Sequence, residues 1–224
     1  MKKFNKLKKF FSDNAEKIFT NTLFVGIILL LAYALVASQK QHSPTNKLKA
    51  TIELQHNELQ YWKYKDSLYV SIKDYINKIA PTSSVDALYL INTCDESDID
   101  IRFVMAQAQL ESHFGTRGMA AKTNQMFNVG AYDNASYDKI HKDYKYENVN
   151  LSIKPYLRLL RTKYLCYEKT TADLLNKYED HNHRRYASDP SYETKLKSIY
   201  NRINTDSLNR LLNNYYKYKN LCKK

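Results

Sequence analysis

The sequence predicts an α+β protein that is mainly α-helical, with one compact domain that carries a small β-hairpin lobe. A transmembrane helix and a helical stalk precede this domain. Three observations support the prediction. Residues 22–38 contain no charged side chain. Apolar residues recur at helical spacings over much of residues 47–111. Residues 128–146 are instead rich in Tyr, Asp and Asn, with Tyr alternating in places, which favours a small hairpin lobe.

Residues 1–21 form a basic leader in which lysines outnumber acidic residues. The uncharged run 22–38 that follows is at the short edge of a bilayer-spanning helix, which needs roughly 17–25 residues. A basic flank before such a run predicts a single-pass membrane protein with a cytoplasmic N-terminus and an exported remainder. A cleaved signal peptide is the alternative, because Ala34, Ala37 and Ser38 supply small residues near the end of the run.

Residues 39–68 are expected to form a linker and a stalk. The linker, residues 39–46, is polar and contains Pro44, and a helix is predicted from there to Ile79. The stalk could self-associate as a short coiled coil. We place the domain itself at residues 69–224, with residues 69–79 packing on it. Pro81 ends this helix, and Thr82 offers an N-cap for the next one.

Four further helices are predicted in the domain. Two of them cover residues 86–93 and 99–111. A third begins near Ser152 and has Pro155 in its first turn. A fourth begins after Asp189, with Pro190 at the first helical position, where the missing N–H costs nothing.

The formal net charge of +12 indicates an anionic partner, which could be a nucleic acid, a membrane or an anionic polymer. Nucleic acid is not expected, because the basic residues are spread along the chain. The sequence lacks zinc-finger spacing and a Gly-rich phosphate loop, so no metal and no cofactor is expected. The three cysteines are far apart and do not form a disulfide framework. A single Cys94–Cys166 bridge stays open if the domain is exported.

Glu111 is the candidate catalytic residue. On a helix it shares an apolar stripe with Ile101, Val104 and Ala108, and it lies at the very end, just before Gly115. Burial against apolar neighbours and the negative end of the helix dipole would both raise the pKa of this carboxyl. Such a group can stay protonated near neutral pH and act as a general acid. From the pattern alone, a solvent-exposed glutamate is the alternative.

The placement of the glycines also singles out this region. The chain has four glycines, of which Gly26 lies in the uncharged run. The other three, Gly115, Gly118 and Gly130, follow Glu111 within twenty residues. Glycine permits tight turns and close approach of a ligand to the backbone, so the backbone freedom of this chain is concentrated next to one carboxylate.

Two separated motifs carry a resemblance to a known family. The first is Ala106-Gln-Ala-Gln-Leu-Glu-Ser-His-Phe-Gly-Thr-Arg-Gly118, followed by Thr123-Asn-Gln-Met-Phe-Asn-Val-Gly-Ala-Tyr132. The second is Arg185-Tyr-Ala-Ser-Asp-Pro-Ser-Tyr-Glu-Thr-Lys-Leu196. They resemble the glucosaminidase family, glycoside hydrolase family 73, which includes the flagellar muramidase-like and autolysin-type enzymes. The resemblance covers roughly residues 69–211 and implies a lysozyme-like domain.

The resemblance implies roles for particular residues. Glu111 matches the catalytic acid and Tyr186 the active-site tyrosine. For the second carboxylate Asp133 ranks first, with Asp138, Asp143 and Glu147 as alternatives. Substrate-binding positions match the motif and the loop after it: Ser112, Asn124, Phe127, Gly130 and Tyr132. The chain departs from the family where the loop usually reads Asn-Asn-Leu-Phe-Gly, because Asn128 replaces the glycine.

The implied activity is hydrolysis of the β-1,4 bond after N-acetylglucosamine in the glycan strands of peptidoglycan. Two alternatives stay open. One is muramidase or lytic transglycosylase action on the other bond, and the second is a catalytically weak, membrane-tethered protein that binds the cell wall. A phage lysis or entry protein with the same chemistry is a further interpretation.

Overall fold

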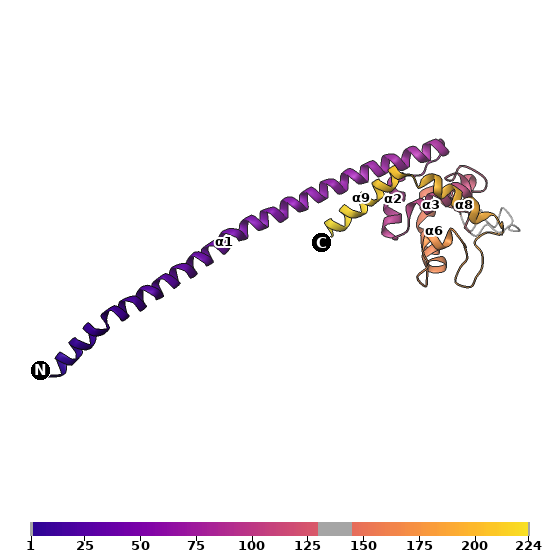
Figure 1. Cartoon of the computed structure of the whole chain (residues 1–224). Coiled ribbons are helices and arrows are strands. Elements are labelled where there is room, and N and C mark those ends of the chain that lie inside the picture. The colour runs from indigo at the N-terminus through magenta and orange to yellow at the C-terminus, as the bar shows by residue number, and fades with distance from the viewer. Residues whose placement is uncertain (1, 130–144, 224) are drawn as a thin grey trace. The chain divides into compact units, whose positions relative to one another are not determined.

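The computed structural model describes residues 2–129 and 145–223, and the regular secondary structure in that part of the chain is mainly helical (Figure 1). In chain order the elements are α1 (Lys2–Ile79), α2 (Ala87–Glu96), α3 (Ile101–Ser112), α4 (Ala120–Thr123), the 3-10 turn η1 (Val149–Ser152), α6 (Ile153–Leu159), the π-turn η2 (Leu160–Tyr164), α7 (Thr171–Leu174), α8 (Tyr192–Ile203) and α9 (Asp206–Cys222). The predicted mainly α fold is confirmed.

β-structure is limited, within the described residues, to an isolated antiparallel bridge between Glu179 and Arg185. The hairpin lobe predicted at residues 128–146 falls for the most part on residues 130–144, which lie outside the described residues. The structure therefore supports the helical part of the predicted fold class.

Helix α1 runs without interruption from Lys2 to Ile79. The prediction that the helix begins only after the linker is therefore wrong, because residues 39–46 are helical as well. Pro44 lacks a backbone N–H and its ring crowds the preceding turn, so it weakens the helix at this point without ending it. The helix ends where predicted, because the residue that precedes Pro81 is disfavoured in the α conformation.

The chain divides into two compact units, residues 1–57 and residues 58–224. The first unit consists of the N-terminal part of α1. Within the described residues, none of the helices combines the length and the apolar character that crossing a membrane requires. Most side chains of residues 22–38, the predicted anchor, lie outside the described residues.

The second unit is built around α3, which lies among α2, α6 and α8 (Figure 1). Almost every residue of α3 from Ile101 to Gln109 is buried. Helix α8 packs on it through an apolar stripe at helical spacing: Tyr192, Leu196, Ile199 and Ile203. The last part of α1 adds a second stripe to the core, made of Leu68, Ile72 and Ile76. Residues 69–79 pack on the domain as predicted, and the packed part of α1 extends back to Tyr61.

Aspartate caps set where α2 and α3 begin. Asp86, and not Thr82, caps α2, because its Oδ1 accepts from the backbone N–H of Leu88 and Tyr89. Asp100 caps α3 in the same way. The predicted helix start at Pro190 is wrong. Asp189 accepts instead from the backbone N–H and the hydroxyl of Ser191, so this pair forms a turn and α8 starts after it.

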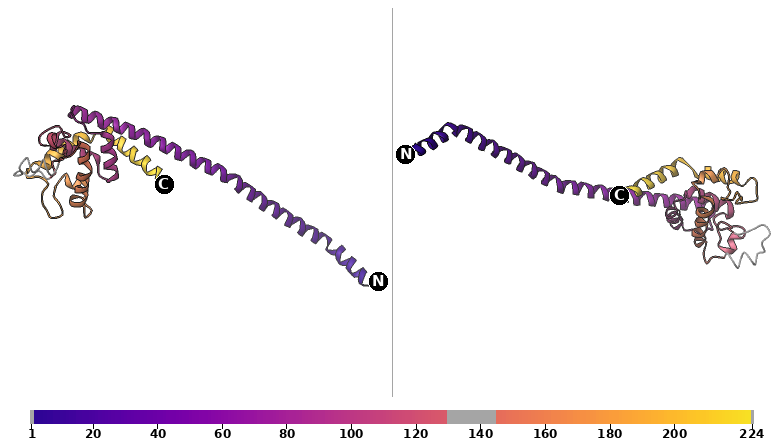
Figure 2. Two further views of the ribbon diagram at one scale, coloured as in Figure 1. Left: turned by 180° about the vertical axis from the view of Figure 1, so that it is seen from behind. Right: turned by 90° about the horizontal axis from the view of Figure 1, so that it is seen from below.

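Tyrosine pairs fasten the C-terminal helix α9. Tyr215 stacks on Tyr61 of α1 with ring centroids 5.5 Å apart, and Tyr218 stacks on Tyr64 at 5.6 Å. Figure 2 shows α9, in yellow, beside the later part of α1. Cys222 at its end, like Cys94 and Cys166, is a free thiol, so the structure does not contain the Cys94–Cys166 bridge.

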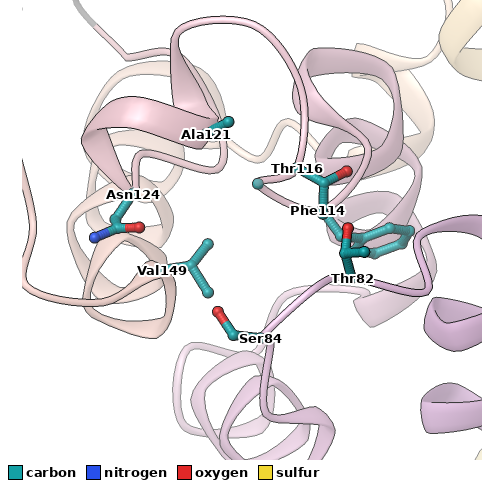
Figure 3. Close-up of a pocket in the computed structure, with 8 residues that line it drawn as sticks. Thr82, Ser84, Phe114, Thr116, Ala121, Asn124 and Val149 are labelled. Atoms are coloured by element: carbon teal, nitrogen blue, oxygen red, sulfur yellow. The ribbon is translucent and has the colours of Figure 1, made fainter.

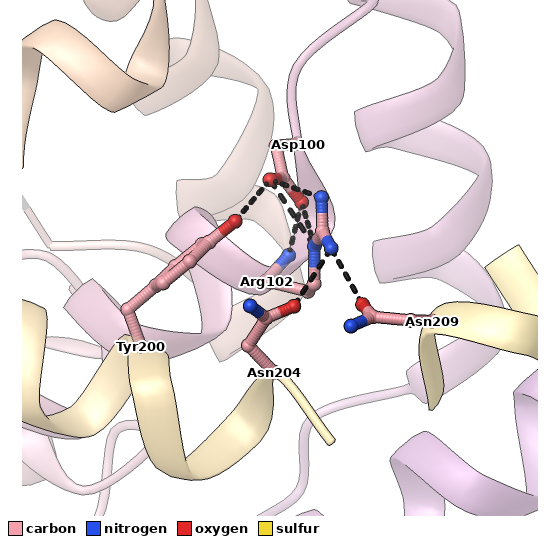
Figure 4. A network of polar contacts seen from close by, with 5 residues as sticks. All are labelled: Asp100, Arg102, Tyr200, Asn204 and Asn209. Carbon is pink, nitrogen blue, oxygen red and sulfur yellow. Dashed lines mark hydrogen bonds and ion pairs between the residues drawn. The ribbon is translucent and has the colours of Figure 1, made fainter. Parts of the chain in front are cut away.

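A polar network joins the start of α3 to the end of α8 and the start of α9 (Figure 4). Arg102 pairs with Asp100 at 2.8 Å and donates from Nη1 to Asn204 Oδ1 at 2.8 Å and to Asn209 Oδ1 at 2.6 Å. The hydroxyl of Tyr200 donates to the same aspartate at 2.9 Å. The guanidinium of Arg102 therefore links the start of α3, the helix that carries Glu111, to the end of α8 and the start of α9.

Candidate active site

Glu111 lies in the last turn of α3, where a run of left-handed residues turns the chain sharply. His113 caps the helix with φ 49°, and its backbone N–H donates to the carbonyl of Gln109. Phe114 (φ 55°) and Gly115 (φ 80°) continue the turn. We expected Gly115 to stop the helix; the structure assigns that role to His113. The sharp turn leaves Glu111 at the edge of the packed core, between α8 and the loop at residues 124–129.

Both oxygens of the Glu111 carboxyl have a donor. The hydroxyl of Tyr192, the first residue of α8, donates to Oε1. The side-chain amide of Asn128 donates to Oε2 at 3.3 Å and to the backbone carbonyl of Glu111 at 2.9 Å. Burial raises the pKa of Glu111 above its ordinary value, although the hydrogen bonds from Tyr192 and Asn128 act in the opposite direction. The predicted rise in pKa is thus present, and burial is its main cause.

A cluster of tyrosines surrounds the carboxyl on the side of α8. Tyr186 stacks on Tyr178 with ring centroids 4.5 Å apart and lies 5.7 Å from the ring of Tyr192. Burial is the main factor that raises the pKa of all three hydroxyls well above the ordinary value, and the charge of Glu111 adds to the rise. These hydroxyls therefore stay protonated at neutral pH, and they act as neutral hydrogen-bonding groups.

The buried side chain of Gln107, on α3, supports the tyrosine cluster. Its side-chain carbonyl accepts from the hydroxyl of Tyr178 at 2.9 Å and from the hydroxyl of Tyr156. The ring of Tyr156 in turn stacks on Phe127 with centroids 3.7 Å apart. A single buried glutamine on α3 thus aligns the aromatic layer that supports the site.

A short turn carries Tyr178 and Tyr186 and is attached to α8 through Glu193. That carboxylate accepts from the backbone N–H of Tyr178 at 3.2 Å and pairs with Arg185 at 2.5 Å. The hydroxyl of Tyr186 donates to the carbonyl of Phe127 at 2.9 Å. The ring of Tyr186 therefore lies near Glu111, but its hydroxyl is bonded to the loop that carries Asn128 and not to the carboxyl.

Three of the predicted substrate-binding residues lie within the described part of the chain, and each makes contacts within the domain. Ser112 is buried, and its hydroxyl donates to the carbonyl of Met126 at 2.6 Å and accepts from the N–H of Gly115 at 2.8 Å. Phe127 is buried. The side-chain amide of Asn124 donates to the carbonyls of Tyr146 at 2.8 Å and of Glu147 at 3.2 Å. It therefore links the residue after α4 to the residues just before η1.

Other predicted site residues are not placed. Gly130, Tyr132 and Asp133 lie outside the described residues, as do Asp138 and Asp143. Glu147 is described and exposed. Among the described residues, no carboxylate contributes to the pKa shift of Glu111 or bonds to it.

Two residues that contact Glu111 were not assigned a role from the sequence. Tyr192 belongs to the second motif, and its spacing to Leu196 and Ile199 places it on the buried face of α8. That periodicity was available as a signal. Asn128 has φ 49°, a backbone conformation that glycine and asparagine both adopt, which is why it can replace the glycine of the family pattern. Its contact with Glu111 had no signal in the sequence.

A pocket of about 270 Å³ opens next to the turn that follows α3 (Figure 3). Its lining is uncharged and is drawn from four segments of the domain: Thr82, Ser84, Phe114, Gly115, Thr116, Ala121, Asn124 and Val149. Glu111 does not line it. The pocket and the carboxyl are therefore separate features of the same domain.

A comparison with protein-family models decides the family. The glucosaminidase model, described as mannosyl-glycoprotein endo-beta-N-acetylglucosaminidase, matches residues 87–205, which is more than half of the chain. The chain belongs to the glucosaminidase family. The match begins with α2 and ends just after α8, so it contains Glu111, Asn128 and Tyr192. No curated protein matches the chain. The glucosaminidase domain is that of a glycoside hydrolase of the endo-β-N-acetylglucosaminidase type.

The turn after α3 allows a test of how closely this glucosaminidase is packed. At Gly115 an added Cβ would lie 2.6 Å from Cγ2 of Val149, and φ is already +80°. We expect Gly115→Ala to lower the free energy of unfolding by about 1–3 kcal/mol, measured by urea denaturation. Gly118→Ala is the matched control, because its φ is +63° but no atom lies within 4 Å of the added Cβ. Equal losses for the two variants would contradict the packing argument.

Proposed function

We propose that this glucosaminidase hydrolyses the β-1,4 bond after N-acetylglucosamine in the glycan strands of peptidoglycan, with Glu111 as the general acid. One observation carries the proposal: in a domain of this family, a carboxyl with a raised pKa lies at the end of a buried helix with a donor on each oxygen. A carboxyl that stays protonated near neutral pH is what protonation of a glycosidic oxygen requires.

The chemical step follows from this arrangement. Protonated Glu111 transfers its proton to the glycosidic oxygen as the C1–O bond breaks, and the leaving sugar departs with a neutral hydroxyl. The resulting carboxylate keeps the hydrogen bonds from Tyr192 and Asn128, which stabilise the ionised form. The carboxylate can then accept a proton from the water that attacks C1, which restores the acid.

The net charge of +12 fits this substrate. Peptidoglycan carries carboxylates on its stem peptides and lactyl groups, and a basic protein attracts such a polymer over long distances at low ionic strength. Asp133 is our candidate for the second catalytic group, because it follows closely after Asn128, which contacts Glu111.

The test is digestion of purified sacculi by the full-length chain, followed by reduction and mass spectrometry of the released muropeptides. The proposal expects reducing ends at N-acetylglucosamine, and it expects Asp133→Asn to slow their release. Reducing ends at N-acetylmuramic acid would indicate a muramidase, and anhydro ends a lytic transglycosylase. Binding to sacculi without release would indicate a wall-binding protein. Any of these three outcomes would replace the proposed specificity.

We also propose that the enzyme is tethered to a membrane through residues 22–38, with its domain on the exported side. The support is the uncharged run and the basic leader before it. In cell fractionation the full-length chain should sediment with membranes and resist a high-salt wash. Recovery in the soluble fraction, or release by salt alone, would contradict the tether.

A further inference from the structure

The second motif contains two tyrosines, Tyr186 and Tyr192, and the structure gives their hydroxyls different acceptors. Tyr186 donates to the backbone carbonyl of Phe127 at 2.9 Å. Tyr192, only 7% exposed, donates to Oε1 of Glu111. The first tyrosine therefore holds the loop, and the second holds the acid itself.

The two donors on the Glu111 carboxyl also differ in what else they bind. The amide of Asn128 is bonded at 2.9 Å to the backbone carbonyl of Glu111 and lies farther, at 3.3 Å, from Oε2. The hydroxyl of Tyr192 has Oε1 as its acceptor. Oε1 thus accepts the stronger hydrogen bond, from Tyr192, and Oε2 accepts the weaker one, from Asn128.

We propose that Tyr192 is the positioning residue of Glu111, and that its hydroxyl, by donating to Oε1, leaves Oε2 as the oxygen that carries the transferable proton. A protonated carboxyl has one carbonyl-like oxygen, which accepts, and one hydroxyl oxygen, which donates. Because Tyr192 donates to Oε1, that oxygen is the carbonyl-like one. Tyr192 thereby fixes both the orientation of the carboxyl and the side from which it donates. This inference rests on the proposed general-acid role of Glu111.

The groups around the carboxyl are consistent with this role. Among the described residues, the titratable groups that interact with the Glu111 carboxyl are Tyr178 and Tyr186, which precede α8, and Tyr192 of α8. All three are neutral phenols, because burial raises their pKa well above the ordinary value. Asn128 cannot titrate. Burial raises the pKa of Glu111. Among the described residues, the hydrogen bonds to its carboxyl are therefore the main factor that lowers this pKa.

The test is Tyr192→Phe in the full-length chain, with activity on sacculi measured across pH. The phenyl ring keeps its place beside Tyr186, but the donor to Oε1 is lost. We expect kcat to fall by about 10-fold or more, with little change in KM. The alkaline limb of the pH profile should move to higher pH, because a hydrogen bond that favours the ionised form is gone and the acid stays protonated longer.

Tyr200→Phe is the matched control. It lies on the same helix and also loses a hydroxyl that donates to a carboxylate, in this case Asp100 at 2.9 Å. A general loss of stability would affect both variants, whereas the pH profile should move in Tyr192→Phe alone. A Tyr192→Phe profile and kcat that match those of the wild type would overturn the inference.

Carboxyl-carbon NMR titration of Glu111 separates this inference from the proposed function. In the wild type, the ring signals of Tyr192 should shift with the same midpoint as the Glu111 carboxyl, and Tyr192→Phe should raise that midpoint. Independent midpoints in the wild type would overturn the inference even if the variant failed to fold. If the wild type left sacculi intact, the proposed function would fail, while the titration would still report on the Tyr192–Glu111 bond.

Discussion

Glu111→Gln is expected to lower the release of muropeptides from sacculi by about 10²- to 10⁴-fold, the usual contribution of a general acid. Glutamine has nearly the same shape, and its side-chain carbonyl can still accept from Tyr192. It has no proton of suitable acidity to transfer. The measurement is the initial rate of release by purified full-length chains that are matched in concentration.

Glu96→Gln is the control for this substitution. Glu96 and its ion-pair partner Lys154 are both exposed on the surface, at 64% and 58%, and neither contacts the tyrosine cluster. This variant should release muropeptides at the wild-type rate. If Glu111→Gln did the same, Glu111 would not be the acid.

Glu111→Gln should also make the protein more stable at neutral pH. Because the folded-state pKa of Glu111 is raised, the folded state holds this proton more tightly than the unfolded state does. The stability that results is fully present below the unfolded pKa of about 4.3 and is lost as pH rises through the folded pKa. Glutamine does not titrate, so the thermal midpoint of Glu111→Gln should exceed that of the wild type at pH 7 and converge with it near pH 4. A gap that does not depend on pH would contradict the cause assigned here.

Arg102→Met should give the largest loss of stability, about 2–4 kcal/mol in free energy of unfolding, measured by urea denaturation. Methionine keeps the apolar stem but removes the guanidinium. Asp100 would then lose its partner in a mostly buried site, and the side-chain carbonyls of Asn204 and Asn209 would lose their donor. Burial of unpaired polar groups is what makes the expected loss large.

The comparison for Arg102 is Lys154→Met, which removes a cation from an exposed pair at 3.4 Å from Glu96. Exposed pairs contribute at most about 1 kcal/mol, so this variant should unfold close to the wild type. Similar losses in the two variants would mean that the network in Figure 4 contributes no more than a surface pair.

The sequence predicted α3 and the place of Glu111 because both depend on local information. A stripe at helical spacing needs only the residues of the helix, and the acid lies in a motif of adjacent residues. The buried stripe of Ile101, Val104 and Ala108 is confirmed. Local information failed at boundaries, where alternatives differ little in energy: Pro44 did not interrupt α1, and Ser191 rather than Pro190 precedes α8.

The contacts that complete the site could not be predicted in this way. Tyr192 meets Glu111 across 81 positions of sequence, and Tyr178 meets Gln107 across 71. Such contacts follow from how α8 and the turn before it pack on α3, which no spacing within one segment specifies. The family resemblance identified Tyr186 as a site residue, but only the fold shows that its hydroxyl is bonded to the loop and not to the acid.

The tyrosine cluster also gives the domain an optical signature of its own. The single tryptophan, Trp62, is 56% exposed on α1, so its emission is expected to change little when the core opens. The stacked rings of Tyr178 and Tyr186 are held in one fixed arrangement, which is the condition for near-ultraviolet circular dichroism and is lost when side-chain packing is lost. Circular dichroism in the tyrosine band therefore follows the packing of the stacked tyrosine pairs, which include the pair near Glu111 and the pairs that hold α9, whereas tryptophan fluorescence reports on one exposed position of α1.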